Sequence, residues 1–331
     1  MSAGSRLGEF GRIATYFRPL AVGVPGAFDL TDDAAILDIP HDQQLVVTAD
    51  GMVAGVHFLP GDDPAELAHK ILAVNMSDLA AKGAEPLAYS LVMALPRAIG
   101  DDWVAAFTQG LGEAQRLFRI NLLGGDSVST HGPMSLTINA LGIVPRGHMI
   151  RRKGAKAGDA LFVTGTIGDA ALGLKLALGT LTRPVPDADK TYLLGRLRRP
   201  TPRLDLVASL RVFATAALDV SDGLVADIGH LAKASAVRLR LDVPAVPLSP
   251  AAARLVVAEP DLLIPILTGG DDYEVAFTAP ADKGDDIAAA AASAGITVTR
   301  IGRVVEGEPG VSVIGADGTE LSLGEGGWRH C

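Results

Sequence analysis

The chain has 331 residues, 48% of them hydrophobic, and a formal net charge of −9. Its length is sufficient for two domains of ordinary size, and its apolar content excludes an intrinsically disordered chain. No run of about 18 apolar residues is present to span a membrane, and the first residues lack the apolar core of a signal peptide. We therefore expect a cytoplasmic protein with no membrane partner.

The charge balance and the cysteine content narrow the class of ligand. With 38 acidic against 29 basic residues, and one basic cluster from Arg146 to Lys156, the chain lacks the basic stripe of a nucleic-acid-binding protein. We expect no nucleic-acid partner. The single cysteine, Cys331, excludes an intramolecular disulfide and a multi-thiolate zinc site. An acidic protein that handles phosphates needs neutralising cations, for which divalent metals are the obvious choice.

Hydrophobic periodicity predicts alternating helices and strands in the first part of the chain. Asp63-Pro64 is a helix-start signal, and Asp50-Gly51 is a turn signal that ends the preceding strand. The expected elements, in chain order, are a helix over 9–20, strands over 34–39 and 44–48, a helix from 63–64 to 80, a strand over 87–95, a helix over 103–118, and strands over 120–123 and 134–144.

A polar, basic segment from Pro145 to Gly158 is the candidate boundary, and we divide the chain into domains 1–148 and 149–331. Beyond the boundary we expect a strand over 160–164, a helix over 169–178, a Pro-rich loop over 182–189, two polar-basic helices flanking 198–202, a strand over 214–220, a helix over 224–235, an apolar run over 262–267, a strand over 275–277, a helix over 287–294 and two short final strands. The pattern indicates an α/β (α+β) protein in which helices pack on sheets in both domains.

Acidic residues recur in one local pattern, a short apolar run followed by Asp beside Gly or Ser. Glycine and serine at such places let the backbone turn sharply and approach a ligand closely. Carboxylates from several strand ends can converge on hard cations, which bind oxygen ligands. Each occurrence taken alone also fits an ordinary surface turn. The occurrences are Asp32-Asp33, Asp50, Asp126, the pair Asp219 and Asp222, and Asp271-Asp272.

Three further features each have two interpretations. Asp78 lies in an otherwise apolar helix and is either a metal ligand or an i,i+4 ion-pair partner of Lys82. His57 follows Asp50 by seven residues and belongs either to a site at the edge of a sheet or to an ordinary hairpin. The basic group within 151–156 either binds phosphates or solvates a linker. No Walker phosphate loop, kinase His-Arg-Asp, Gly-x-Ser-x-Gly or His-Glu-x-x-His motif is present.

Taken together, these segments resemble the thiamine-monophosphate kinase family, within the superfamily of aminoimidazole-ribonucleotide synthetase and selenophosphate synthetase. The motifs run in family order along nearly the whole chain, and the stretch Val53-Ala-Gly-Val-His-Phe58 is more particular to the thiamine-phosphate enzymes. The resembling pieces are Gly8–Phe10, Thr31–Ala35, Thr48–Phe58, Ala73–Ala84, Gly124–Asp126, Leu218–Gly223, Gly269–Glu274 and Gly327-Trp328.

The resemblance implies a two-domain synthetase-like fold, with an N-terminal mixed sheet that forms a β-barrel across a homodimer and a C-terminal α/β domain. It implies ATP-dependent phosphorylation of thiamine monophosphate to thiamine diphosphate, with several Mg²⁺ ions and with Asp50, Asp78, Asp126 and Asp219 central to catalysis. By position, the magnesium ligands are Asp32, Thr48, Asp50, Asp78, Asp126, Asp219 and Asp222; the nucleotide residues are Gly125, Asp126, Arg152 and Ser221; and the thiamine-phosphate residues are His57, Asp271 and Trp328.

Three positions differ from the usual family pattern. The loop Asp29-Leu-Thr-Asp-Asp replaces Gly-x-Gly-Asp-Asp, Asp271 stands where Glu is usual, and Ala49 stands where a hydroxyl residue is common. None of these differences removes a carboxylate. Two other functions remain open: an ATP-dependent activation of an amide or carbonyl oxygen, as in the purine-pathway relatives, and a cation- or nucleotide-binding regulator without turnover.

Overall fold

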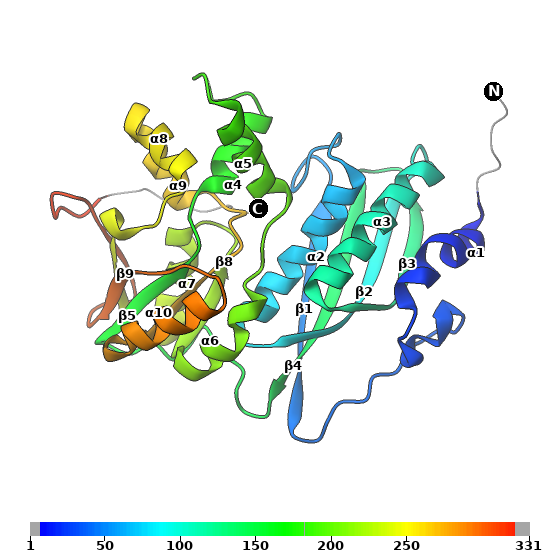
Figure 1. Cartoon of the computed structure of the whole chain (residues 1–331), viewed down its shortest axis with the longest axis horizontal. Coiled ribbons are helices and arrows are strands. Elements are labelled where there is room, and N and C mark those ends of the chain that lie inside the picture. Colours follow the sequence, from blue (N-terminus) through cyan, green and yellow to red (C-terminus); the bar gives the residue numbers. More distant parts are fainter. Residues whose placement is uncertain (1–6, 182, 322–331) are drawn as a thin grey trace. The chain divides into compact units, whose positions relative to one another are not determined.

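The computed structural model describes residues 7–181 and 183–321, and they form two compact units (Figure 1). Unit 1 comprises the chain up to Leu79 together with Ala84–Gly147, and unit 2 comprises Ala80–Gly83 together with the chain from His148 onward. Within the described residues, no helix has the length and apolar character needed to cross a membrane.

Unit 1 is built on a four-stranded sheet with the order β1-β4-β2-β3. Strands β1 and β2 are antiparallel to β4, and β3 is parallel to β2. The strands are β1 (Gln43–Val53), β2 (Glu85–Pro96), β3 (Asn121–Thr130) and β4 (Ser135–Pro145).

Helices α2 (Pro64–Ala81) and α3 (Asp101–Phe118) lie side by side over one face of this sheet (Figure 1). Asp63 starts α2 as predicted, because its Oδ1 accepts hydrogen bonds from the backbone N–H groups of Ala65 and Glu66 at 2.9 and 3.1 Å. A Cβ at Gly110 of α3 would lie 2.5 Å from the Cα of Ala65, so glycine lets the two helices approach closely.

Side chains along β1 alternate between the two faces of the sheet. Val46 and Met52 are buried on the face that the helices cover, whereas Leu45 and Val47 are 41% and 62% exposed on the other face. The second face therefore presents apolar side chains to solvent at β1.

The segment before β1 is helical in short pieces, in line with the helix predicted over 9–20. The pieces are α1 (Glu9–Arg12), the π-helix η1 (Ile13–Phe17) and the 3₁₀ turns η2 (Arg18–Ala21) and η3 (Pro25–Leu30). The strand predicted over 34–39 is wrong. Ile36 is 60% exposed, and its N–H donates to the Gly26 carbonyl at 2.9 Å, so the segment follows the η3 turn and joins no sheet.

The predicted turn at Asp50-Gly51 is also wrong. Strand β1 continues through it to Val53, with Asp50 opposite Ile138 and Gly51 opposite Thr137 in the β4 ladder. Pairing with a distant strand overrides the local turn preference. For the same reason Gly124–Ser127, predicted to follow a strand, lies inside β3.

Unit 2 contains a six-stranded sheet with the order β10-β7-β9-β5-β8-β6, in which only the β10–β7 pair is parallel. Sequence patterns predicted β5, β6, β8 and the last two strands but missed β7. The strands are β5 (Asp159–Thr164), β6 (Ala216–Val220), β7 (Arg238–Asp242), β8 (Glu274–Pro280), β9 (Val298–Val305) and β10 (Gly310–Ile314).

Helices pack on both faces of this sheet. One face, which carries Leu161 and Leu218, shares a core with α4, α5, α7, α8 and α9, and the other, which carries Phe162 and Phe277, packs on α6 and α10. The predicted mixed α/β fold in two parts is thereby confirmed. The helices are α4 (Asp169–Ala177), α5 (Asp187–Arg198), α6 (Val207–Phe213), α7 (Leu224–Ser235), α8 (Pro250–Ala258), α9 (Leu263–Thr268) and α10 (Gly284–Ser293), with 3₁₀ turns at η4 (Leu204–Leu206), η5 (Val243–Ala245), η6 (Pro260–Leu262) and η7 (Ala281–Lys283).

Candidate functional site

Three of the predicted site residues meet at one face of the unit 1 sheet. Thr48 and Asp50 are two residues apart on β1 and share the face that α2 covers. The Thr48 hydroxyl donates to Oδ2 of Asp78, on α2, at 2.5 Å. Asp78 is half-buried, although every residue from Ile71 to Ser77 is buried. Strand and helix therefore hold two carboxylates and a hydroxyl together.

Asp50 and Asp78 are both acidic, so their charges repel each other rather than forming an ion pair. Burial raises the pKa of Asp50 to about 6, and the negative charge of Asp78 contributes to the same increase. Among the residues that the structure describes, neither carboxylate forms an ion pair. Lys82, the alternative partner of Asp78, donates its ammonium group to the Ala217 carbonyl at 2.9 Å.

The donor set fits a hard divalent cation. Carboxylate and hydroxyl oxygens are the ligands that Mg²⁺ prefers, and two adjacent like charges are stabilised by a positive ion between them. Within the described ranges no three His, Cys, Asp or Glu side chains lie close enough to hold an ion. The recruitment of further carboxylates to Asp50 and Asp78 therefore stays a prediction.

A cavity of about 1260 Å³ in unit 1 brings together Asp32, Gly125 and Asp126. Its walls come from the N-terminal helical segment, from the loop after η3 and from β2 and β3, and they combine these polar groups with apolar side chains such as Phe17 and Leu91. The size and the mixed lining suit a ligand with apolar and charged parts.

Gly125 is required at this wall, because a Cβ there would lie 1.8 Å from the carbonyl oxygen of Leu91 on β2. In the ladder, Asp126 is level with Gly51 rather than with Asp50. Since neighbouring residues of a strand point to opposite faces, Asp126 and Asp50 belong to opposite faces of the sheet. The two acidic groups of unit 1 are therefore separate: Asp50 with Asp78, and Asp32 with Asp126.

In unit 2, two loops carry predicted site residues to the same edge of the sheet. Buried Asp219 lies on β6, and Ser221 and Asp222 follow the strand directly. The loop before β8 packs against them, because the Asp271 N–H donates to the Ser221 carbonyl at 2.9 Å and the Tyr273 N–H to the Val220 carbonyl at 2.8 Å. The structure thus places Ser221 and Asp222 beside Asp271.

Comparisons with known proteins identify the family of this chain. The chain matches the AIR synthase related protein family, with the N-terminal domain over residues 31–144 and the C-terminal domain over 156–314. It is 46% identical to a thiamine-monophosphate kinase of Caulobacter vibrioides over 329 residues, covering 97% of this chain and 90% of the relative. The chain belongs to the thiamine-monophosphate kinase family.

Two solved structures of this family extend the similarity to three dimensions. The thiamine-monophosphate kinase of Stenotrophomonas maltophilia is 43% identical, with a TM-score of 0.80 over 88% of this chain and 91% of the other. The structure described as "AaThiL complexed with AMPPCP and TMP" is 32% identical, with a TM-score of 0.78 over 100% of both chains. The family predicted from the motifs is confirmed.

The family resemblance assigns His57 and Trp328 to thiamine-phosphate binding, and only His57 lies among the described residues. His57 closes a tight turn after β1: its Nδ1 accepts from the Val53 backbone N–H at 3.1 Å, and the backbone N–H of His57 donates to the Val53 carbonyl at 3.0 Å. The hydrogen bond from Val53 orients the ring, and a substrate role for His57 stays a prediction. Trp328 lies outside the described residues.

Sequence reasoning missed Asp227, on the first turn of α7. Its Oδ2 accepts from the backbone N–H groups of Ser221 and Asp222, at 3.0 Å each. Burial raises the pKa of Asp227 to about 7, while the nearby positive charge of Arg152 acts in the opposite direction. Asp227 thus holds the turn that carries two predicted ligand residues, and exposed Arg152 lies close to that turn. An acidic residue in a helix's first turn is too common a feature to reveal this.

Proposed function

We propose that the chain transfers the γ-phosphoryl group of ATP to thiamine monophosphate, giving thiamine diphosphate and ADP. Membership of the thiamine-monophosphate kinase family carries the proposal. Support also comes from the full-length similarity to a structure that holds AMPPCP, an ATP analogue, together with TMP. The enzyme is a phosphotransferase whose acceptor is itself a phosphate group.

The chemistry of the acceptor explains the residue types. A phosphate monoester has a second pKa of about 6, so the acceptor is already an anionic nucleophile at neutral pH. No general base is needed, and transfer proceeds directly and in line, without a covalent enzyme intermediate. The task left to the protein is to hold two polyanions together in the correct geometry.

Acidic side chains perform this task by holding cations. Thr48, Asp50 and Asp78 would hold one Mg²⁺, and Asp32 with Asp126 would provide a second acidic position at the cavity of unit 1. Bound Mg²⁺ supplies positive charge that lets the triphosphate and the acceptor phosphate approach. Asp219 and Asp222, on unit 2, are further metal ligands by their family positions.

The remaining site residues bind the two substrates. Gly125, Asp126, Arg152 and Ser221 take the nucleotide, and His57, Asp271 and Trp328 take thiamine monophosphate. We further propose that the enzyme is a cytoplasmic homodimer whose subunits pair through the open face of the first sheet. The exposure of apolar Leu45 and Val47 on that face supports the pairing.

The test is phosphoryl transfer from γ-labelled ATP to thiamine monophosphate by the purified chain, with and without Mg²⁺. The proposal predicts labelled thiamine diphosphate, ADP in equal amount and no free phosphate, all dependent on the metal. Unphosphorylated thiamine serves as the control acceptor and should remain unlabelled. Release of inorganic phosphate would instead indicate the activation chemistry of the purine-pathway relatives, and a trapped phosphoenzyme would contradict direct transfer.

A further inference from the structure

The loop that carries Asp271 has an unusual backbone. Asp271 and Tyr273 both adopt the left-handed conformation, with φ of 71° and 51°, which is costly for residues other than glycine. Strained conformations persist only where surrounding contacts hold them. Besides the backbone hydrogen bonds to Val220 and Ser221, side-chain contacts hold this loop. They come from the two acidic residues that alternate with the strained ones, Asp272 and Glu274.

Asp272 ties the loop to the start of α4. Its side chain is 1% exposed, and its Oδ2 accepts from the Gly168 N–H at 2.8 Å, while Oδ1 lies 3.5 Å from the Ala170 N–H. Burial raises the pKa of Asp272 well above the usual range of a carboxyl group.

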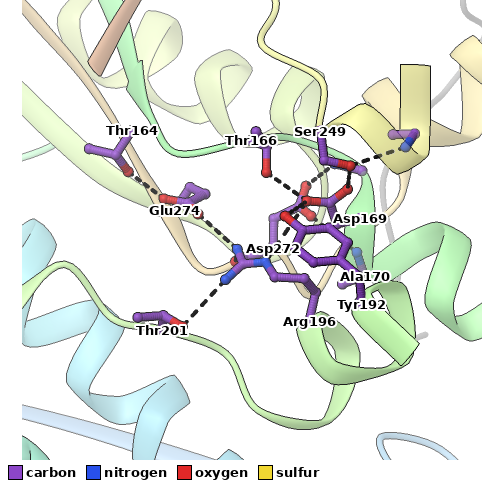
Figure 2. Close-up of polar contacts among 12 residues, drawn as sticks. Thr164, Thr166, Asp169, Ala170, Tyr192, Arg196, Thr201, Ser249, Asp272 and Glu274 are labelled. Atoms are coloured by element: carbon purple, nitrogen blue, oxygen red, sulfur yellow. Dashed lines mark hydrogen bonds and ion pairs between the residues drawn. The ribbon is translucent and has the colours of Figure 1, made fainter. Parts of the chain in front are cut away.

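Glu274 ties the other side of the loop to two arginines, Arg196 and Arg203, and Figure 2 shows the contact with Arg196. Its side chain is fully buried, and it accepts from Arg196 at 2.8 Å, from Arg203 Nε at 2.6 Å and from the Thr164 hydroxyl at 2.6 Å. Arg196 also reaches the Asp272 carbonyl oxygen at 3.4 Å. The Arg196 guanidinium thus contacts the loop at both acidic residues: at the side chain of Glu274 and at the backbone carbonyl of Asp272.

The network leaves Asp271 as the acidic side chain directed outward. Asp272 and Glu274 are buried, whereas Asp271 is partly exposed. The Tyr273 hydroxyl donates to Asp271 Oδ1 at 3.0 Å, which fixes the orientation of that carboxylate. A network that served stability alone would gain little, because burying charges costs about as much as their pairing returns.

We propose that Tyr273 and the Asp272–Arg196–Glu274 network are positioning residues that set Asp271 for recognition of the thiamine phosphate substrate. The inference rests on the proposed function, because it takes Asp271 as a substrate residue. It goes further by assigning the orientation of Asp271 to residues that do not themselves contact the substrate.

The sharpest test is Tyr273→Phe, which keeps the ring and removes only the hydroxyl. Loss of a hydrogen bond to a charged group predicts a rise of about tenfold in KM for thiamine monophosphate. KM for ATP and kcat should change less than about twofold, and the unfolding midpoint by less than about 2 °C. A structural role alone would lower the midpoint without separating the two KM values.

Arg196→Lys tests the network itself, since lysine keeps the charge but cannot contact Glu274 and the loop carbonyl with one planar group. The expected result is the same selective rise in KM for thiamine monophosphate. Arg254→Lys is the matched control, because Arg254 forms a two-pronged pair with Asp189 elsewhere in unit 2 and should leave both KM values unchanged.

The outcomes separate this inference from the proposed function. If the wild-type chain phosphorylates thiamine monophosphate and Tyr273→Phe leaves its KM unchanged, the positioning role is wrong and the function stands. An equal rise in KM for both substrates also contradicts the positioning role. Failure of the wild-type chain to turn over overturns the proposed function, and the inference with it.

Discussion

Two groups of buried or half-buried carboxylates in this protein differ in how their charge is balanced. In unit 2, Glu274 is surrounded by Arg196 and Arg203, so its negative charge is neutralised within the protein. In unit 1, Asp50 and Asp78 face each other, and neither forms an ion pair with a described residue. The difference fits the proposed division of roles: a neutralised group stabilises a loop, whereas two facing like charges are suited to bind a cation.

The largest expected effect tests the unit 1 pair. Asp50→Asn keeps the size of the side chain but removes the charge that attracts Mg²⁺. We expect kcat for thiamine monophosphate phosphorylation to fall by roughly 10³-fold or more, because metal and electrostatic stabilisation contributes several kcal/mol to such reactions. Asp102→Asn, an exposed position on α3, is the control and should retain activity. Near-normal turnover of Asp50→Asn would contradict the metal-binding role.

In the unit 2 network, by contrast, removal of a charge should mainly lower the stability of the fold. Glu274→Gln leaves two half-buried guanidinium groups without their counter-charge, and breaking a buried pair costs about 3–5 kcal/mol. Denaturant unfolding should therefore show a large loss of stability, whereas Glu306→Gln, at an exposed position, should have little effect. If Glu274→Gln is as stable as the wild type, the network does not hold the loop as described.

The pH dependence of stability sharpens the same comparison. Because the pKa of Asp50 is raised from 3.8 to about 6, the folded state binds a proton more tightly than the unfolded state between these values. Stability of the metal-free wild type therefore falls as pH rises through this window, by about 3 kcal/mol. Asp50→Asn lacks this loss, so it should match the wild type near pH 4 and exceed it by about 3 kcal/mol at pH 7. An equal difference at both pH values would refute the raised pKa.

A smaller effect concerns the cavity of unit 1 that Gly125 lines. In Gly125→Ala, the new methyl group meets the Leu91 carbonyl oxygen and must displace β3 from β2. Overpacking of this kind costs about 2 kcal/mol and should weaken ATP binding at the same time. Gly124→Ala is the matched control, since no atom lies within 4 Å of its added Cβ. Similar unfolding curves for both variants would show that the contact is not limiting.

Local signals were sufficient for much of the fold. The predicted helix over 224–235 coincides with α7, and Asp63 starts α2 as expected, because capping and helical periodicity act over a few residues. The predicted turn at Asp50-Gly51 failed for the opposite reason. Its backbone pairs with β4, which lies far along the chain, and no local preference encodes that partner.

The site residues show the same difference: local sequence signals identified some of them, and only the tertiary structure reveals the others. Residue type and order identified Asp50 and Asp78 as candidates, but only the packing of α2 on β1 shows that they face each other. Asp227 and Arg196 escaped notice, because their roles depend on backbone groups and carboxylates brought to them by tertiary structure. The roles of Asp32, Asp126, Asp219 and Asp222 as shared metal ligands remain predictions.

The most direct measurement is calorimetric titration of the nucleotide-free protein with Mg²⁺ at pH 6, in buffers of different ionisation enthalpy. At this pH the Asp50 carboxyl is about half protonated. We predict that the wild type binds Mg²⁺ with release of about half a proton, and that Asp50→Asn lacks this component. Identical binding and proton release in both proteins would contradict the claim that Asp50 and Asp78 form the cation-binding pair.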